Sequence, residues 1–209
     1  MSKRTVVLIL IGLIAAAGGA LLGRYVASRP GPPVLAAGTW LPAARAIPDV
    51  PLFDQTGAAR DASVFAGAPA LLFFGFTHCP DVCPTTLAKM AAIARQTPLP
   101  QLRLLFVSVD PERDDAAALA RYVNAFAPGL GAEVWRGIGG PPSSIARLTA
   151  SLGVASARVS LPGGDYTIDH SATIFLLDAR GEVVAVFTPP FDVDGIVRDL
   201  RAVGARLAP

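Results

Sequence analysis

The sequence predicts an α/β domain in which a central mixed β-sheet is flanked by helices. Apolar runs of strand length alternate with segments of helical periodicity through most of the chain. Near the C-terminus the alternation changes, because two strand-like runs follow each other directly and one further helical segment closes the chain. These two observations predict a layered domain, and they do not favour a fully parallel, doubly wound sheet.

The strand predictions rest on short apolar runs. Leu71–Phe76 is unbroken, as expected for a strand that is buried on both faces. Leu102–Val109 is a second, mainly apolar run, and Val134–Ile138 predicts a third, shorter strand. Between and after these runs, helical spacing predicts helices over three segments: Leu87–Arg95, Asp114–Phe126 and Ser143–Leu152.

The last part of the chain predicts a hairpin and a closing helix. Thr173–Leu177 and Val183–Phe187 flank a turn sequence that ends in Gly181, a residue suited to a left-handed turn position. Val193–Leu207 then carries helical spacing. A terminal hairpin followed by a helix is typical of a thioredoxin-like plan, which is the fold that we predict.

Length and charge limit the function classes. The chain has 209 residues, enough for one domain and a short appendage. Its 18 basic and 16 acidic side chains give a formal net charge of +2. No run of like charges supplies the basic surface that nucleic-acid binding needs, so we expect no nucleic-acid partner.

The N-terminal segment predicts a membrane anchor over residues 1–28. Two basic residues precede Val6–Gly23, eighteen residues without a charge. As a helix this run would measure about 27 Å, close to the roughly 30 Å of a hydrocarbon core. A cleaved signal peptide is the alternative, with small residues at Ala15–Ala17 for the peptidase. In both cases the rest of the chain is exported, and we expect a single-pass protein of the bacterial inner membrane with its domain in the periplasm.

The amino-acid composition divides the chain after the predicted anchor into two parts, residues 29–48 and residues 49–209. Residues 29–48 are rich in Pro, Ala and Gly, which predicts a tether between the anchor and the domain. Residues 49–209 contain all the predicted strands and helices, and they are expected to form the thioredoxin-like domain.

Cys79 and Cys83 are the candidate functional residues with the strongest local pattern. They follow the Leu71–Phe76 strand, and Pro84 suits the first position of the next helix, which would make Cys83 its N-cap. A helix N-terminus lowers a thiol pKa, so two thiolates near the surface are expected. Three interpretations stay open on the residues alone: a structural disulfide, a redox-active dithiol, or a site for a soft metal such as Cu(I) or Zn(II).

The chain has two histidines, His78 and His170. His170 directly precedes the Thr173–Leu177 strand, and in a thioredoxin-like sheet the loop entering that strand lies beside the helix that follows the cysteines. His78 adjoins Cys79, but neighbouring residues at a strand end face opposite sides, so His78 is expected to point away. Asp169 is a candidate for orienting His170, although a simple turn role explains it equally well.

Three segments resemble the signature motifs of the Sco/SenC family. They are Gly75–Thr85, Ser108–Asp114 and Tyr166–Ser171, in the order and spacing that the family shows. The resemblance implies a thioredoxin-like fold and a copper site made by Cys79, Cys83 and His170. It also implies a metallochaperone that helps to assemble the dinuclear copper centre of cytochrome c oxidase.

The same resemblance implies the partners and one alternative activity. The expected partners are the copper-bearing subunit of cytochrome c oxidase and a protein that donates copper. Cu(I) is the expected cargo, with Cu(II) as a second state. Some members of the family act instead as thiol–disulfide oxidoreductases, in which case Cys79 and Cys83 would be the redox pair. We expect a metallochaperone rather than an enzyme.

Overall fold

The computed structural model describes residues 2–27, 31–97, 99, 101–128, 130 and 134–208. The chain divides into two compact units, Met1–Pro33 and Val34–Pro209. Residues 28–30, where the predicted anchor meets the predicted tether, lie outside the described residues.

The first unit contains one helix, α1 (Lys3–Ala27). It covers the charge-free segment from which the anchor is predicted. Across the part of the chain that the structure describes, however, no helix combines the length and the apolar character needed to cross a membrane. The helix is therefore confirmed, and the membrane anchor stays a prediction.

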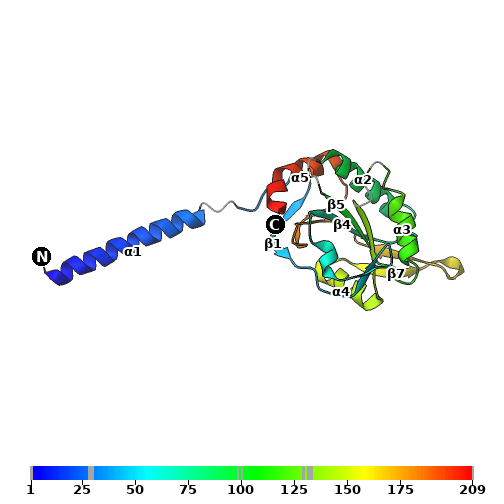
Figure 1. Cartoon of the computed structure of the whole chain (residues 1–209), viewed down its shortest axis with the longest axis horizontal. Coiled ribbons are helices and arrows are strands. Elements are labelled where there is room, and N and C mark those ends of the chain that lie inside the picture. Colours follow the sequence, from blue (N-terminus) through cyan, green and yellow to red (C-terminus); the bar gives the residue numbers. More distant parts are fainter. Residues whose placement is uncertain are drawn as a thin grey trace. The chain divides into compact units, whose positions relative to one another are not determined.

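The second unit is built on an eight-stranded mixed sheet with the strand order β1-β10-β9-β4-β5-β6-β2-β3. Figure 1 shows β4 and β5 side by side within this unit. β4, β5 and β6 are parallel, and β9 joins β4 antiparallel. Each strand predicted from an apolar run is present. The bounds are β1 (Thr39–Arg45), β2 (Leu52–Asp54), β3 (Ala59–Arg60), β4 (Ala70–Gly75), β5 (Arg103–Ser108), β6 (Trp135–Gly139), β9 (Ile174–Leu177) and β10 (Val183–Phe187).

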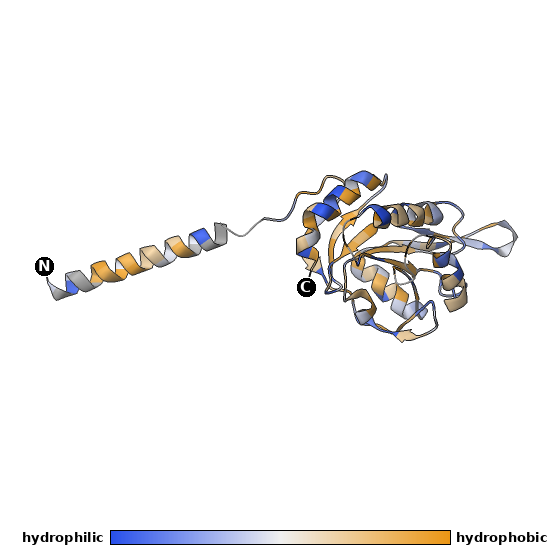
Figure 2. Cartoon of the chain, turned by 45° about the horizontal axis from the view of Figure 1, so that its top comes forward, coloured by the Kyte–Doolittle hydropathy of each residue, from blue (hydrophilic) through white to orange (hydrophobic). Residues whose placement is uncertain are grey.

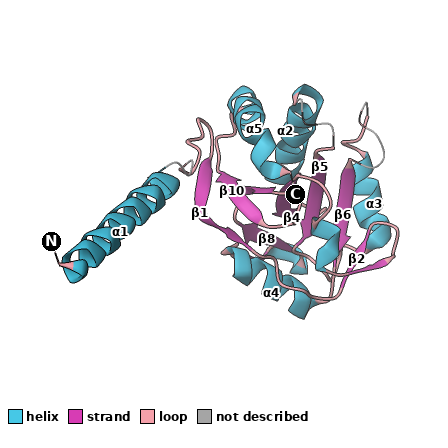
Figure 3. Ribbon diagram, turned by 60° about the vertical axis from the view of Figure 1, so that its left-hand side comes forward, coloured by secondary structure: helices cyan, strands magenta, loops and turns pink. Residues whose placement is uncertain are grey.

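Helices cover both faces of this sheet. α2 (Val82–Gln96) and α5 (Val193–Leu207) lie side by side on one face, and α4 (Pro142–Leu152) lies on the other (Figure 3). α3 (Ala116–Asn124) packs on β6. Apolar residues gather on the strands and on the sheet-facing sides of the helices (Figure 2). All six residues of β4 are buried, so the functional segments at its C-terminal end start from a rigid core strand.

The N-terminal edge of the domain differs from the prediction. Thr39–Arg45, within the predicted tether, forms strand β1 and pairs antiparallel with β10. The backbone N–H groups of Ala36 and Ala37 donate to the buried carboxylate of Asp199. The tether prediction is therefore wrong from about residue 36 onward, because hydrogen bonds fix this segment to the domain despite its exposed side chains.

A separate two-stranded sheet stands apart from the main one. β7 (Ser156–Ser160) and β8 (Tyr166–His170) pair antiparallel over their full length, with Ser156 opposite His170 and Ser160 opposite Tyr166. We call this pair the β7–β8 hairpin. The sequence does not predict it, because all five residues of β7 are exposed and neither strand carries a buried apolar face. The hairpin matters because His170 is its last residue.

Candidate metal centre

The cysteines lie in and beside the first turn of α2. The backbone N–H of Cys79 donates to the carbonyl of Phe76 at 3.2 Å, which closes a turn directly after β4. α2 begins at Val82 with Asp81 at the capping position, so the prediction that Cys83 is the N-cap is wrong by two residues. Pro84 still fits, because the first-turn N–H groups of a helix have no carbonyl partner within the helix. One of these groups, the N–H of Cys83, donates instead to Cys79 Sγ at 3.4 Å.

Burial distinguishes the two thiols. Cys83 is completely buried, whereas Cys79 is partly exposed. Space for Cys83 depends on Gly75, because a Cβ atom there would lie 2.8 Å from Cys83 Sγ. Burial raises the pKa of the Cys83 thiol above its ordinary value, so the predicted lowering by the helix dipole is wrong for this residue. Removal of its hydration is the largest cause of this higher pKa, and it favours the protonated thiol over the thiolate that binds a metal.

His170 completes the group, although it lies 87 residues from Cys83 in the sequence. Its Nε2 atom is 3.3 Å from Cys83 Sγ, and its Nδ1 atom is 3.2 Å from the carbonyl oxygen of Ser171. Nδ1–H therefore donates to that carbonyl, and the lone pair of Nε2 faces the sulfur atoms. Burial lowers the pKa of His170, which favours the neutral imidazole that binds metals. The carbonyl of Ser171 therefore orients the His170 ring, the role for which Asp169 was a candidate. Asp169 is exposed.

Two phenylalanines hold the imidazole ring. The rings of Phe73 and Phe76 meet the ring of His170 edge-on, with centroid separations of 5.8 and 5.9 Å. Cys79 and His170 border a cleft of about 260 Å³ whose wall also includes Phe76 and Val82. Val82 is 47% exposed. Solvent therefore reaches Cys79 and His170 through this cleft, while Cys83 lies buried behind them.

The structure brings Cys79, Cys83 and His170 together as predicted. One donor atom from each lies within 4.8 Å of the others, and we call these residues the sulfur group. Two thiol sulfurs and one imidazole nitrogen suit a soft cation, and three donors satisfy Cu(I), while structural Zn(II) sites take four. The chemistry of the donors therefore fits copper better than the other first-row metals.

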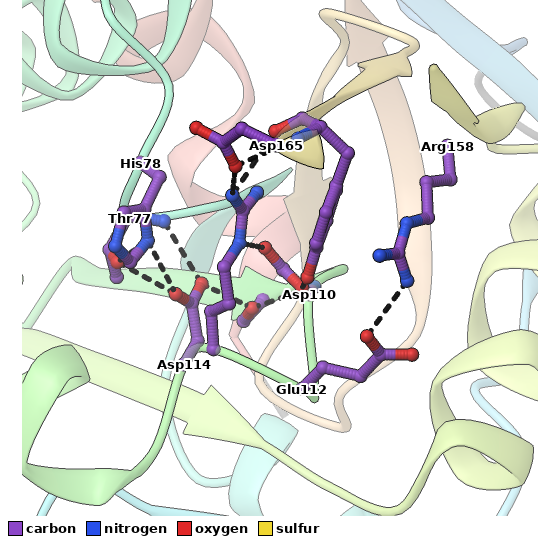
Figure 4. Close-up of polar contacts among 10 residues, drawn as sticks. Thr77, His78, Asp110, Glu112, Asp114, Arg158 and Asp165 are labelled. Atoms are coloured by element: carbon purple, nitrogen blue, oxygen red, sulfur yellow. Dashed lines mark hydrogen bonds and ion pairs between the residues drawn. The ribbon is translucent and has the colours of Figure 1, made fainter. Parts of the chain in front are cut away.

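A second group of possible ligands comprises His78, Asp110 and Asp114, which we call the carboxylate group. Asp114 is buried and accepts hydrogen bonds from the backbone and hydroxyl of Thr77 and from the hydroxyl of Ser108. Figure 4 shows His78 and Thr77 facing Asp114, with His78 Nδ1 3.6 Å from its carboxylate. His78 thus points to the carboxylates and away from the sulfur group, as predicted.

Hydrogen bonds already occupy the oxygens of the carboxylate group. Asp110, which is 2% exposed, accepts from the Tyr166 hydroxyl and from Arg113 Nε, at 2.7 and 2.6 Å. Asp115 caps α3 by accepting from the N–H of Ala118. The roles of Tyr166 and Arg113 were not predicted, and their only sequence signal was that both lie in motifs resembling the Sco/SenC family.

Comparison with known proteins assigns the chain to one family. The family model described as SCO1/SenC matches residues 42–205. The bovine "Protein SCO2 homolog, mitochondrial" is 43% identical over 138 residues, which cover 64% of this chain and 50% of the relative. The chain thus spans about half the length of that relative.

Solved structures show the same fold. The structure of Bradyrhizobium japonicum ScoI with copper bound matches with a TM-score of 0.66 and 36% identity, covering 75% of this chain and 98% of the other. The crystal structure of Arabidopsis thaliana ScoI with copper bound matches with a TM-score of 0.67 and 30% identity, covering 75% and 99%. With the family model matched over most of the domain, the chain belongs to the SCO1/SenC family.

Proposed function

We propose that this protein is a Cu(I) metallochaperone that holds its ion through Cys79, Cys83 and His170. The observation that carries the proposal is the convergence of their three donor atoms to within 4.8 Å from two distant parts of the chain. Copper-bound relatives at 30% and 36% identity support the choice of metal. The proposed destination is the dinuclear copper centre of cytochrome c oxidase, with its copper-bearing subunit as acceptor and a separate protein as donor. Cu(II) is proposed as a second state of the same site.

The geometry supports transfer by ligand exchange. Cys79 and His170 border the cleft and are partly exposed, whereas Cys83 is completely buried. A thiolate of the acceptor that enters the cleft reaches the ion on the side of Cys79 and His170. These two ligands are therefore displaced first, and Cys83 releases the ion last.

Anaerobic titration of the reduced protein with Cu(I) tests the proposal. One ion per chain is expected, with strong loss of affinity in Cys79→Ser and Cys83→Ser. His170→Ala should weaken retention of the ion while the fold stays intact, because the imidazole packs at the edge of the core. Unchanged affinity in His170→Ala would remove this residue from the ligand set.

A thiol–disulfide reductase that acts on the cysteines of the acceptor is the second candidate. The observation in its favour is that both cysteines are free and adjacent, with the N–H of Cys83 donating to Cys79 Sγ. A reductase needs both thiols but has no use for His170. Negligible copper uptake by the parent protein, with reductase activity retained in His170→Ala, would favour the enzyme over the chaperone.

We also propose that residues 1–28 attach the protein to the bacterial inner membrane, with the domain in the periplasm. Support comes from the charge-free run after two N-terminal basic residues. Fractionation of cells that express the full chain tests this: the protein should stay with the membranes after a high-salt wash. Release of the intact chain with the periplasmic contents would contradict the anchor.

A further inference from the structure

The β7–β8 hairpin needs external support to hold His170 in place. Its two strands form a sheet of their own, outside the eight-stranded sheet, and all five residues of β7 are exposed. An isolated two-stranded hairpin is marginally stable in water. The position of His170 therefore depends on the contacts that fasten this hairpin to the body of the domain.

One set of these contacts surrounds Tyr166, the first residue of β8, while hydrogen bonds between Ser171 and Ala155 tie the end that carries His170. Its ring lies between two guanidinium groups, with Arg113 Cζ 3.6 Å and Arg158 Cζ 3.5 Å from the ring centroid. Its hydroxyl donates to Asp110 at 2.7 Å. The ring thus makes cation–π contacts on both faces while its polar tip reaches a buried carboxylate.

Arg113 joins the hairpin to the body of the domain. Its Nε donates to Asp110 at 2.6 Å, and its Nη1 donates to the carbonyl of Tyr166 at 3.1 Å and to Asp165 at 3.2 Å. Arg113 therefore binds both the backbone of β8 and the loop after β5. Its Cζ also lies 6.0 Å from the centroid of Phe76, which packs against the His170 ring.

Arg158 contacts the face of the Tyr166 ring that Arg113 leaves open. It extends from β7 and pairs with Glu112 at 2.8 Å, as Figure 4 shows. Both side chains of this pair are more than half exposed, so the pair itself is weak. The value of Arg158 lies in covering the second face of the Tyr166 ring.

We propose that Asp110, Glu112, Arg113, Arg158 and Tyr166, together the Tyr166 clasp, position His170 for copper. The clasp fixes one end of β8, and the imidazole lies at the other end, about 13 Å away at roughly 3.3 Å per residue. None of the five belongs to the sulfur group, so they act through the hairpin and not as ligands. The inference rests on the proposed function, since it assumes that His170 binds the ion.

Loosening the clasp lowers the fraction of molecules in which His170 faces the cysteines. The apparent affinity for Cu(I) equals the intrinsic affinity multiplied by this fraction. We expect Tyr166→Leu to weaken Cu(I) binding by about tenfold if the hairpin is in place one tenth of the time. Tyr166→Phe keeps the ring between the two guanidinium groups, so it should restore most of the affinity. The loss in any clasp variant should not exceed the loss in His170→Ala.

The test is a double-mutant cycle on the full reduced chain, with Cu(I) as the probe and a chromophoric chelator as competitor. Tyr166→Leu is measured alone and in the His170→Ala background. Because the clasp acts through His170, it should have no further effect once the imidazole is gone. X-ray absorption of the Cu(I)-loaded Tyr166→Leu protein should show a reduced nitrogen contribution with both sulfurs retained.

A second variant, Arg158→Ala, tests the Tyr166 clasp even if Tyr166→Leu fails to fold. Arg158→Ala removes an exposed side chain, so the domain should stay folded while its affinity for Cu(I) falls by about threefold. Arg147→Ala, which removes an exposed arginine of α4, is the matched control and should leave affinity unchanged. Hydrogen exchange of the metal-free protein should be faster at the β8 amides in Arg158→Ala only.

The possible results distinguish a failure of the proposed ligand set from a failure of the Tyr166 clasp. If His170→Ala itself leaves Cu(I) affinity unchanged, the proposed ligand set fails. If His170→Ala weakens binding but Tyr166→Leu and Arg158→Ala do not, the clasp is overturned and the copper site stands. Equal losses from Tyr166→Leu with and without His170 would likewise overturn the clasp, since it would then act by another route.

Discussion

The sulfur group and the carboxylate group share the segment between β4 and α2, but their ligand atoms have different hydrogen-bond partners. His78 and Cys79 are neighbours in the chain, yet they belong to different groups. The oxygens of Asp114 already accept three hydrogen bonds from protein donors. In the sulfur group, by contrast, the hydrogen-bond contacts run between its own members: the N–H of Cys83 donates to Cys79 Sγ, and Cys83 Sγ lies 3.3 Å from His170 Nε2. Proximity of ligand atoms is therefore not enough, because a soft cation can replace a proton shared inside the sulfur group, whereas the carboxylates would have to give up hydrogen bonds from the rest of the protein.

Replacement of a sulfur donor should produce the largest effect on metal binding. In Cys83→Ser a hard hydroxyl oxygen takes the place of the buried soft ligand. We expect Cu(I) affinity to fall by more than about 100-fold, the upper range for losing a residue that only orients a ligand. Competition with a Cu(I) chelator measures this loss. A decrease of less than tenfold would mean that the ion is held elsewhere.

Loss of a carboxylate should instead affect stability. Asp114→Ala removes the acceptor of the Thr77 N–H and of the hydroxyls of Thr77 and the buried Ser108. Loss of these hydrogen bonds, with the Ser108 hydroxyl left in the core, should cost about 2–4 kcal/mol of unfolding free energy. Denaturant unfolding measures the change, and the variant should still take up one Cu(I) per chain at low temperature. Loss of the ion with unchanged stability would place Asp114 at the metal and contradict the division between the groups.

Gly75→Ala should move the buried sulfur. The new Cβ would lie 2.8 Å from Cys83 Sγ and 2.9 Å from a ring carbon of Phe106. Overpacking of this kind costs about 1–3 kcal/mol, and the displaced sulfur should also weaken Cu(I) binding several-fold.

Gly137→Ala is the matched control for this variant. Its new Cβ would lie 3.1 Å from Leu119 and 3.3 Å from Val123, both on α3, and would contact no member of the sulfur group. It should lower stability and leave Cu(I) affinity unchanged. Equal affinities in the Gly75 and Gly137 variants would show that the position of Cys83 does not depend on Gly75.

The smallest effect is expected at His78. Its side chain is 54% exposed, and its Nδ1 atom lies 3.1 Å from the Thr77 hydroxyl and 3.6 Å from the Asp114 carboxylate. His78→Ala should change Cu(I) affinity by less than about twofold, since exposed pairs of this kind contribute little. The same competition assay checks it. A loss comparable to that of His170→Ala would make His78 a ligand and erase the distinction between the two groups.

The core of the fold could be predicted because its strands are buried on both faces. β4 appears in the sequence as an unbroken apolar run, and β5 contains the apolar run Leu104–Val107. β1 and the β7–β8 hairpin could not be predicted, since their side chains are largely exposed. Hydrogen bonds to partners distant in the sequence hold them, and neither composition nor periodicity records such partners.

The ligands of the site could be named from motif resemblance, but their environment could not. The raised pKa of Cys83 comes from its burial, in a place that the missing side chain of Gly75 leaves open. The contact between Tyr166 and Asp110 joins residues 56 positions apart. Such features arise only when distant segments pack together, so local sequence patterns do not contain them.

X-ray absorption at the copper edge of the reduced, Cu(I)-loaded protein tests the central claim most directly. A three-coordinate ion with two sulfur neighbours and one imidazole nitrogen is expected, and His170→Ala should remove the nitrogen while both sulfurs stay. A parent spectrum with sulfur neighbours alone, unchanged in His170→Ala, would contradict the account.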